Sequence, residues 1–428
     1  MNSTVRRIVV AVCLTAPLGL APAVRAQGSL TPPGAPAETM KTLTQVEPRI
    51  PISSAPYTVS QPGSYYLTTN LTCTGHGVII TSSRVTLDLM GFALAGDRGV
   101  SDYGIFLDGA TNAPLSHVVV RNGITCNFGY GVRAEYMQNC RFEQLAAANN
   151  SFYGIGFEAS QGLCNGNAVV DCRVNGNGAN GVYLYGSLGQ CNGNTFANCM
   201  VSGNGGYGIR FKGDYGQCNG NTITGCAISG NAAEGILLDG AFGRCDGNTI
   251  TRTAISSNGS CGIWLYGYDG QCDGNAVTDC TISDNFYKGV FLYGAYGQCD
   301  GNTFRACTLT GNGADGGFYL SGISGQCDGN TIADCMIQKN TSYGIYLFLA
   351  DGNRVEGNHI SGQTGNMTYG IYCNNTAKNL ILRNTCVGQT NNFTIGANDT
   401  FGPIVTSSGA LSTTNGAAGL SPWANFSR

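Results

Sequence analysis

Short runs of alternating apolar and polar residues recur along most of the chain, and glycine and asparagine bound each run. Residues 216–243 are representative: Thr222 to Ile228 and Gly235 to Leu238 alternate, and Asn-Gly and Ser-Gly-Asn sequences separate them. Alternation with a period of two is typical of a β-strand with one buried face. No part of this repeat has a helical period, so the pattern predicts an all-β protein.

The strands belong to a repeat of nearly constant length. Its marker, typically Gly-Gln-Cys-[Asn/Asp]-Gly-Asn, recurs at intervals of 27 residues five times and then 28, at Cys164, Cys191, Cys218, Cys245, Cys272, Cys299 and Cys327. A strict period in this range indicates a solenoid. A leucine-rich repeat would need a Leu-x-x-Leu-x-Leu frame, which is absent. We therefore predict a parallel β-helix with about twelve coils of mostly 27 residues.

The coils resemble those of the pectate-lyase-like superfamily of right-handed parallel β-helix proteins. The resemblance rests on the pattern N-T-I-x-x-C-x-I-S-G-N-x-x-x-G-I-x-L and on the early stretch from Pro62 to Gly96, and it covers residues 50 to 390. It implies a right-handed solenoid. Members include lyases, hydrolases, epimerases, phage tailspikes and non-catalytic surface proteins. No catalytic motif of a member matches, so no catalytic residue is carried over.

Four segments are expected along the chain. Residues 1–26 have the features of a signal peptide, because Arg6 and Arg7 precede an apolar run and small residues precede Gln27. Residues 27–56 are expected to be a linker and N-terminal cap, 57–395 the β-helix, and 396–428 a C-terminal tail or cap. The signal predicts a secreted, periplasmic or cell-surface protein.

Composition excludes two kinds of partner. The net charge is -3 and charged residues make up 11 %, so the chain lacks the basic surface that nucleic acid requires. Beyond the signal, no segment is apolar enough to span a membrane.

One asparagine of each marker is predicted to lie inside the coil corner and to stack on its neighbours. This column is Asn167, Asn194, Asn221, Asn248, Asn275, Asn302 and Asn330. Stacked amides would satisfy buried polar groups coil by coil.

A second cysteine follows most markers by eight residues, which favours a disulfide within each coil. The expected pairs are Cys164–Cys172, Cys191–Cys199, Cys218–Cys226, Cys245–Cys261, Cys272–Cys280, Cys299–Cys307 and Cys327–Cys335. Bonds between neighbouring coils and free buried thiols are the alternatives. Cys-x₇-Cys is not zinc-ligand spacing, and the three histidines are scattered, so no metal site is predicted from these residues.

Two outward columns form an aromatic surface. Aligned on the Gly-[Ile/Val] strand, they run from Phe106 to Tyr372 and from Asp108 to Asn374. Exposed aromatic arrays mark binding surfaces, and flat rings suit the faces of sugars. The predicted binding residues are Tyr183, Tyr185, Tyr215, Trp264, Tyr266, Phe291 and Tyr293. The alternative is the ordinary preference of tyrosine for exposed strands.

Charged residues interrupt this surface. Glu135 and Glu158 lie one coil apart, about 5 Å, which fits the carboxyl pair of a retaining glycosidase. Arg210 and Lys212 with Asp239 and Arg244 could instead neutralise a uronate and move a proton, as a lyase or epimerase requires. A solvated cross-strand charge cluster is the alternative for all six.

A further column, Asn165, Asn192, Asn219, Asp246, Asp273, Asp300 and Asp328, follows the marker cysteines. Its stacked carboxylates suggest raised pKa values or bound Ca²⁺, and an ordinary Asx-Gly turn is the alternative. No other cofactor is expected.

Two functions are consistent with these patterns. The first is an exported carbohydrate-binding β-helix protein that acts on an acidic polysaccharide as a lyase, epimerase or hydrolase. The second is a non-catalytic surface or matrix protein with a structural or adhesive role.

Overall fold

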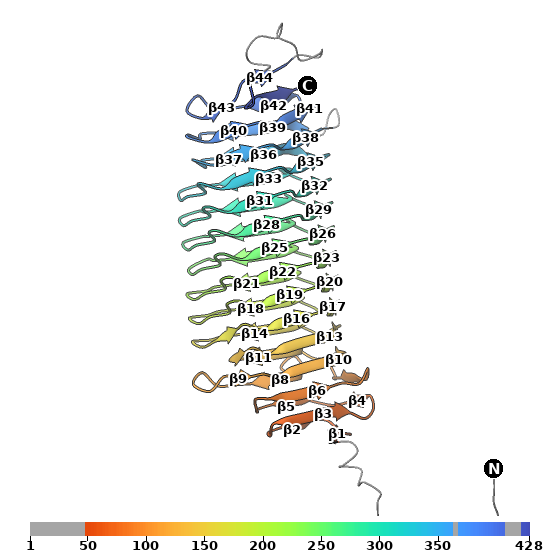
Figure 1. Ribbon diagram of the computed structural model, residues 1–428. Helices are drawn as coiled ribbons and strands as arrows, with labels where there is room; N and C mark the ends of the chain where they lie inside the picture. Colours follow the sequence, from red (N-terminus) through yellow and green to blue (C-terminus); the bar gives the residue numbers. More distant parts are fainter. Residues whose placement is uncertain (1–47, 363–366, 407–420) are drawn as a thin grey trace, which may run out of the picture. The chain divides into compact units, whose positions relative to one another are not determined.

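Parallel β-strands make up the regular structure of the computed structural model, which describes residues 48–362, 367–406 and 421–428 (Figure 1). Residues 49–428 form one unit. No helix occurs among the described residues, so this part of the chain contains no helix that could cross a membrane. The predicted signal peptide lies outside the described residues.

One strand of each coil joins a 14-stranded sheet. Its members are β2 (Tyr57–Val59), β5 (Val78–Ile80), β8 (Tyr103–Asp108), β11 (Tyr130–Glu135), β14 (Ile155–Glu158), β18 (Val182–Tyr185), β21 (Ile209–Lys212), β24 (Ile236–Asp239), β27 (Ile263–Tyr266), β30 (Val290–Tyr293), β33 (Phe318–Ser321), β36 (Ser342–Phe348), β39 (Met367–Asn374) and β42 (Asn391–Thr394).

Two shorter strands of most coils join a 28-stranded sheet. Its members are β1 (Ile50–Ile52), β3 (Gly63–Leu67), β4 (Leu71–Thr72), β6 (Val85–Asp88), β7 (Ala93–Ala95), β10 (Val119–Cys126), β13 (Arg141–Ala148), β16 (Ala168–Val170), β17 (Arg173–Asn175), β19 (Thr195–Ala197), β20 (Met200–Ser202), β22 (Thr222–Thr224), β23 (Ala227–Ser229), β25 (Thr249–Thr251), β26 (Ala254–Ser256), β28 (Ala276–Thr278), β29 (Thr281–Ser283), β31 (Thr303–Arg305), β32 (Thr308–Thr310), β34 (Thr331–Ala333), β35 (Met336–Gln338), β37 (Arg354–Glu356), β38 (His359–Ser361), β40 (Leu380–Leu382), β41 (Thr385–Val387), β43 (Thr400–Phe401), β44 (Ile404–Val405) and β45 (Asn425–Ser427). A small third sheet contains β9 (Leu115–Ser116), β12 (Met137–Gln138) and β15 (Cys164–Asn165).

The register between coils follows the repeat. Ile223 on β22 pairs with Ile250 on β25, and Ile250 pairs with Val277 on β28, so equivalent side chains stack. These inward side chains are almost fully buried, and burial of each contributes about 1.5–3 kcal/mol. The predicted parallel β-helix is confirmed, and the predicted number of about twelve coils is close to the fourteen strands of the 14-stranded sheet, which receives one strand from each coil.

Strands in the segments expected to cap the β-helix pair with its end coils. At the start, β1, within residues 27–56, pairs with β3. At the end, β45, within residues 396–428, pairs with β41 and β44. Both segments lack the Cys-[Asn/Asp]-Gly-Asn marker, so their sequences do not reveal that they complete coils.

The predicted asparagine column is confirmed as a buried ladder. Asn221 Nδ2 donates to Asn248 Oδ1 at 3.0 Å, and the backbone N–H of Asn221 donates to the same oxygen at 2.8 Å. A second ladder, which was not predicted from the sequence, runs through Asn150, Asn177, Asn204, Asn231, Asn258, Asn285, Asn312 and Asn340. The Ser-Gly-Asn sequences that carry Asn204 and Asn231 had been interpreted only as turns.

The cysteines form two columns along the stack instead of bonded pairs within coils. All nineteen cysteines among the described residues are free. The pairs Cys164–Cys172, Cys191–Cys199, Cys218–Cys226, Cys245–Cys261, Cys272–Cys280, Cys299–Cys307 and Cys327–Cys335 are therefore not formed in the structure. The Asn-Gly or Asp-Gly corner does not reverse the chain as expected. It turns the next asparagine into the ladder, and a strand then carries the chain on to the second cysteine.

Candidate functional site

The outward columns of the 14-stranded sheet are aligned as predicted. Tyr183 pairs with Arg210, Arg210 with Leu237, Leu237 with Trp264, and Trp264 with Phe291. In the next coil the structure buries Phe318 and turns Tyr319 outward. The strand register therefore brings the predicted aromatic residues to one surface.

The rings on this surface stack on one another, both between neighbouring coils and along single strands. Trp264 and Phe291 are stacked with ring centroids 5.5 Å apart, and Tyr266 and Tyr293 are 5.9 Å apart with planes at 5°. Tyr183 stacks on Tyr185 at 5.5 Å. Because each ring covers its neighbour, these columns present mainly ring edges and tyrosine hydroxyls to solvent. Tyr183 is itself buried, and the other five are half-buried.

Glu135 and Glu158 meet at a shared guanidinium. Arg133 Nη2 lies 2.6 Å from Glu135 Oε1 and 2.8 Å from Glu158 Oε2, and Gly156 opposite Arg133 leaves room for its side chain. The rings of Tyr103 and Tyr130 cover the guanidinium at 5.1 and 5.2 Å. Burial raises the pKa of Glu158, whereas Arg133 opposes the shift. The predicted carboxyl pair thus exists, with a cation between its members.

Arg210, Lys212 and Asp239 are also brought together, and each is paired. Arg210 Nη2 lies 2.5 Å from Asp239 Oδ2, and Lys212 Nζ lies 3.2 Å from Asp214 Oδ2. The Tyr185 hydroxyl donates to Asp214 Oδ2 at 3.0 Å. Arg210 is therefore neutralised by a carboxylate that is only 4 % exposed. These cations are less available to a uronate than the sequence suggested.

Arg244 lies apart from this cluster. Its backbone bridges Gln217 and Gln271 in the glutamine column beyond the turn that follows β24. Burial raises the pKa of Asp246 and Asp273 in the neighbouring acidic column, and the charge of Arg244 opposes this shift. A role for Arg244 beside Arg210 is therefore not supported, because four residues that form a tight turn separate it from Asp239.

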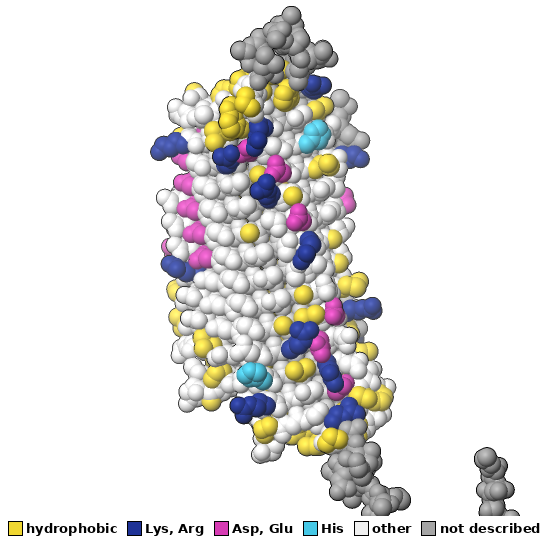
Figure 2. Space-filling model, in the orientation of Figure 1, with side chains coloured by type: hydrophobic (Ala, Val, Ile, Leu, Met, Phe, Trp, Pro, Cys, Tyr) yellow, Lys and Arg dark blue, Asp and Glu magenta, His cyan; other side chains and the backbone are white. Residues whose placement is uncertain are grey.

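The acidic column is continuous over five coils, and a row of acidic side chains is visible along one edge of Figure 2. Asp246, Asp273, Asp300 and Asp328 each accept the backbone N–H of the next column member at 2.7–2.9 Å. Burial and the repulsion between neighbours raise the pKa of Asp273 to about 6. The described residues contain no group of three or more His, Cys, Asp or Glu side chains that could hold a metal ion. Bound calcium stays a prediction.

The turns after the 14-stranded sheet carry exposed apolar side chains. We call Leu188, Tyr215, Phe242, Tyr268 and Tyr296 the turn ridge. Tyr215 and Phe242 are stacked at 5.6 Å, and Tyr268 meets both Phe242 and Tyr296 edge-on. Unlike the strand columns, the ridge exposes most of its rings: Tyr215 is 65 % and Tyr296 64 % exposed.

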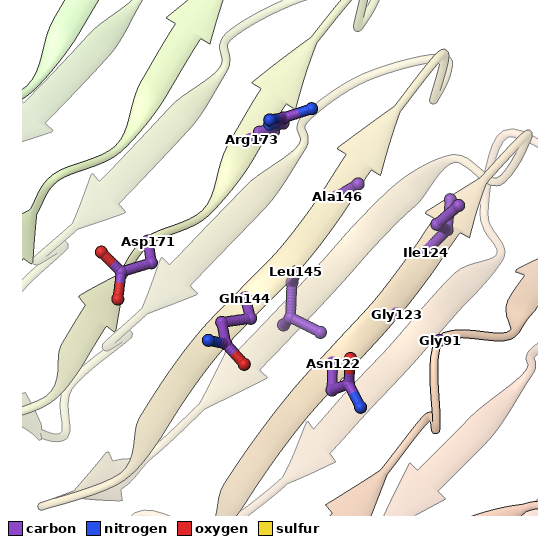
Figure 3. A pocket seen from close by; sticks show the side chains of 9 residues that line it. All are labelled: Gly91, Asn122, Gly123, Ile124, Gln144, Leu145, Ala146, Asp171 and Arg173. Atoms are coloured by element: carbon purple, nitrogen blue, oxygen red, sulfur yellow. The ribbon is translucent and has the colours of Figure 1, made fainter.

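A shallow hollow of about 290 Å³ lies on the 28-stranded sheet, where sequence analysis placed no site. Asn122, Gln144 and Asp171 lie along one side, and Ile124, Ala146 and Arg173 along the other (Figure 3). Asp171 Oδ1 accepts a hydrogen bond from Asn198 at 3.2 Å. The hollow arises where β10 and β13 bend at residues with left-handed backbone, such as Asn122 and Gln144.

The family model described as a right-handed beta helix region matches residues 103–272, 163–327 and 274–427, which together span well over half of the chain. The chain belongs to the right-handed β-helix family. The predicted resemblance is thereby confirmed at the level of fold. A comparison with curated protein sequences gives no significant match.

Solved structures share this β-helix at low sequence identity. ORF18 of Geobacillus virus E2 is 17 % identical with a TM-score of 0.52, and the match covers 61 % of this chain and 52 % of the viral one, so the chain spans about half of that protein. The A-module of an Azotobacter vinelandii mannuronan C-5 epimerase is 14 % identical with a TM-score of 0.47, covering 77 % of this β-helix chain and 90 % of the module. A pectate lyase is 16 % identical with a TM-score of 0.40, covering 70 % of each chain. These likenesses concern the fold alone.

Proposed function

We propose that this protein is an exported polysaccharide-binding protein, which uses the outer surface of the 14-stranded sheet and the turns that follow it. The observation that carries the proposal is the unbroken series of aromatic side chains from Trp264 through Phe291 to Tyr319, flanked by the turn ridge. An extended polymer suits a surface on which equivalent groups recur in every coil. Tyrosine hydroxyls and ring edges would bind sugar hydroxyls, and exposed rings would pack on sugar faces.

Binding is favoured over catalysis because the candidate catalytic groups are engaged. Asp239 is bound by Arg210, and Glu135 and Glu158 share Arg133. A general base needs a free carboxylate, and an acid–base pair needs two carboxyls whose pKa values differ. A non-catalytic surface or adhesive protein is thus our preferred form of the proposal.

One observation favours hydrolysis as a second candidate. Glu158 has a raised pKa, as a general acid requires, and it faces Glu135 across a single guanidinium nitrogen. If this pair is catalytic, reducing ends should accumulate from one polysaccharide, and Glu158→Gln should abolish their release. A chain that retains a polysaccharide without shortening it is a binding protein.

Affinity electrophoresis in gels that contain single polysaccharides tests binding. We expect retardation by at least one neutral or acidic polysaccharide, and a loss of about tenfold in affinity for Trp264→Ala combined with Tyr266→Ala. Phe286→Ala is the matched control, because Phe286 is a 66 % exposed aromatic residue outside the surface. Unchanged mobility with every polymer would refute the proposal. Export is tested separately: N-terminal sequencing of the protein from the culture fluid or periplasm should begin at Gln27.

A further inference from the structure

The turn ridge places large side chains where the backbone disfavours them. Each turn has the form Gly-x-x-Gly and is closed by a hydrogen bond, as from Gly216 N–H to Gly213 O at 2.9 Å. Its third residue has positive φ: 52° at Tyr215, 57° at Phe242 and 56° at Tyr296. Such turns favour Gly or Asn at this position, because a Cβ strains the left-handed conformation.

These aromatic side chains gain little from folding in return. Tyr215, Phe242 and Tyr296 are 65 %, 42 % and 64 % exposed. The same turn position holds Asp269 in another coil, with φ of 49°, so the turn itself does not need an aromatic ring. Strained backbone under an exposed apolar group points to a role in binding rather than in stability.

A hollow of about 350 Å³ lies directly beside the ridge, between Leu188, Tyr215 and the glutamine column. Gln190 Oε1 and Gln217 Oε1 both accept from Asn192 Nδ2, at 3.4 and 3.2 Å. Among the described residues, the Nε2 groups of these two glutamines have no acceptor. Further along, Gln271 Nε2 donates to Gln298 Oε1 at 2.8 Å and Gln298 Nε2 donates to Gln326 Oε1 at 2.9 Å, so the donors of Gln271 and Gln298 are used within the column.

The chemistry of the hollow selects an uncharged ligand. None of its ten lining residues carries a charge. Lys212, before the turn that carries Tyr215, is paired with Asp214, whose side chain is 18 % exposed. Arg244 follows Gln217 in the glutamine column, where its charge acts on Asp246 and Asp273 of the acidic column. Beyond the hollow, the column beside the glutamines changes from Asn219 to Asp246 and stays acidic to Asp351. A polyanion that followed the ridge would be repelled by this column.

We propose that the hollow binds one sugar of a neutral polysaccharide, with Tyr215 packed on the sugar face and Gln190 and Gln217 donating to its hydroxyl oxygens. The polymer continues along the turn ridge over Phe242. The inference rests on the proposed polysaccharide binding and specifies its location and ligand class. The volume of the hollow lies within the range of ~300–1,000 Å³ that is usual for ligand pockets.

The test uses the full-length mature protein and affinity electrophoresis with dextran, laminarin, mannan, polygalacturonate and alginate. We expect retardation by at least one of the three neutral polymers and by neither polyanion. Tyr215→Asn should weaken that binding at least tenfold, and Gln190→Leu combined with Gln217→Leu should have a similar effect. Phe286→Asn, which removes an equally exposed ring from another turn, should bind as the parent does.

A thermal melt separates a binding defect from a folding defect. Tyr215→Asn should melt at the parental temperature or above it, because asparagine tolerates the left-handed backbone. Binding of the polyanions alone, or full binding by Tyr215→Asn, would overturn the inference while leaving the proposed function standing. Absence of binding to all five polymers would overturn both.

Discussion

Removing one amide from the first asparagine ladder should destabilise the whole solenoid measurably. Asn221 is fully buried, and its Oδ1 accepts both the backbone N–H and the Nδ2 of Asn194, at 2.8 and 3.0 Å. In Asn221→Ala, the buried backbone N–H of Asn194 loses its acceptor, which costs about 1–3 kcal/mol. The side-chain bonds to Asn194 and Asn248 are lost as well, at about 0.5–1.5 kcal/mol each.

The expected loss is therefore roughly 2–6 kcal/mol in the free energy of unfolding. Urea unfolding followed by far-ultraviolet circular dichroism measures it. Thr222→Ala is the control, because this half-buried neighbour makes no side-chain hydrogen bond among the described residues, and it should cost less than about 1 kcal/mol. Asn221→Ala and Asn248→Ala share one bond, so their double variant should lose less than the sum. Equal losses for Asn221→Ala and Thr222→Ala would show that the ladder does not stabilise the fold as argued.

Three other predictions concern charge and thiols. The pKa of Asp273 is raised to about 6 in the fold, so its contribution to stability is fully present below the unfolded pKa near 3.8 and is lost as pH rises through 6. Asp273→Asn should therefore reduce the decrease of the urea midpoint between pH 4 and pH 7. An unchanged dependence of the midpoint on pH would contradict this. Arg133→Met should lower the urea midpoint by exposing Glu135 and Glu158 to each other, and adding Glu158→Gln should restore part of the loss; no restoration would mean that repulsion is not the cause. Thiol titration without reductant should find nineteen reactive groups from Cys73 to Cys386 after unfolding and only a few before it; recovery of far fewer after unfolding would indicate disulfides.

The repeat made the fold predictable from the sequence. The marker fixed the coil length, and the alternation around Ile223 and Ile236 assigned the inward side chains correctly. The ladder through Asn221 followed because each marker holds one invariantly spaced asparagine. The ladder through Asn231 was missed because Ser-Gly-Asn is also an ordinary turn sequence, and local sequence does not distinguish a stacked amide from a solvated one.

The site was less predictable, because it depends on side-chain directions and not on register alone. The alignment of the columns predicted that Trp264 lies beside Phe291, but it did not predict that the two rings stack and cover each other's faces. Spacing brought Glu135 near Glu158, and only the structure shows Arg133 between them. Arg244 was grouped with Arg210 by coil, although a tight turn directs the chain around a corner between Asp239 and Arg244. The four intervening residues do not reveal such a change of direction.

The asparagine ladder tolerates coils of unequal length. Asn302 is bonded to Asn330 across 28 residues, and Asn330 to Asn353 across 23, with the same amide contacts. Only the corner is constant, so residues gained or lost in a turn leave every neighbouring coil undisturbed. Because each coil presents the same upper and lower edge, duplication of one 27-residue segment would lengthen the protein without a new junction. Such a gene can extend or shorten its product by unequal recombination, one coil at a time.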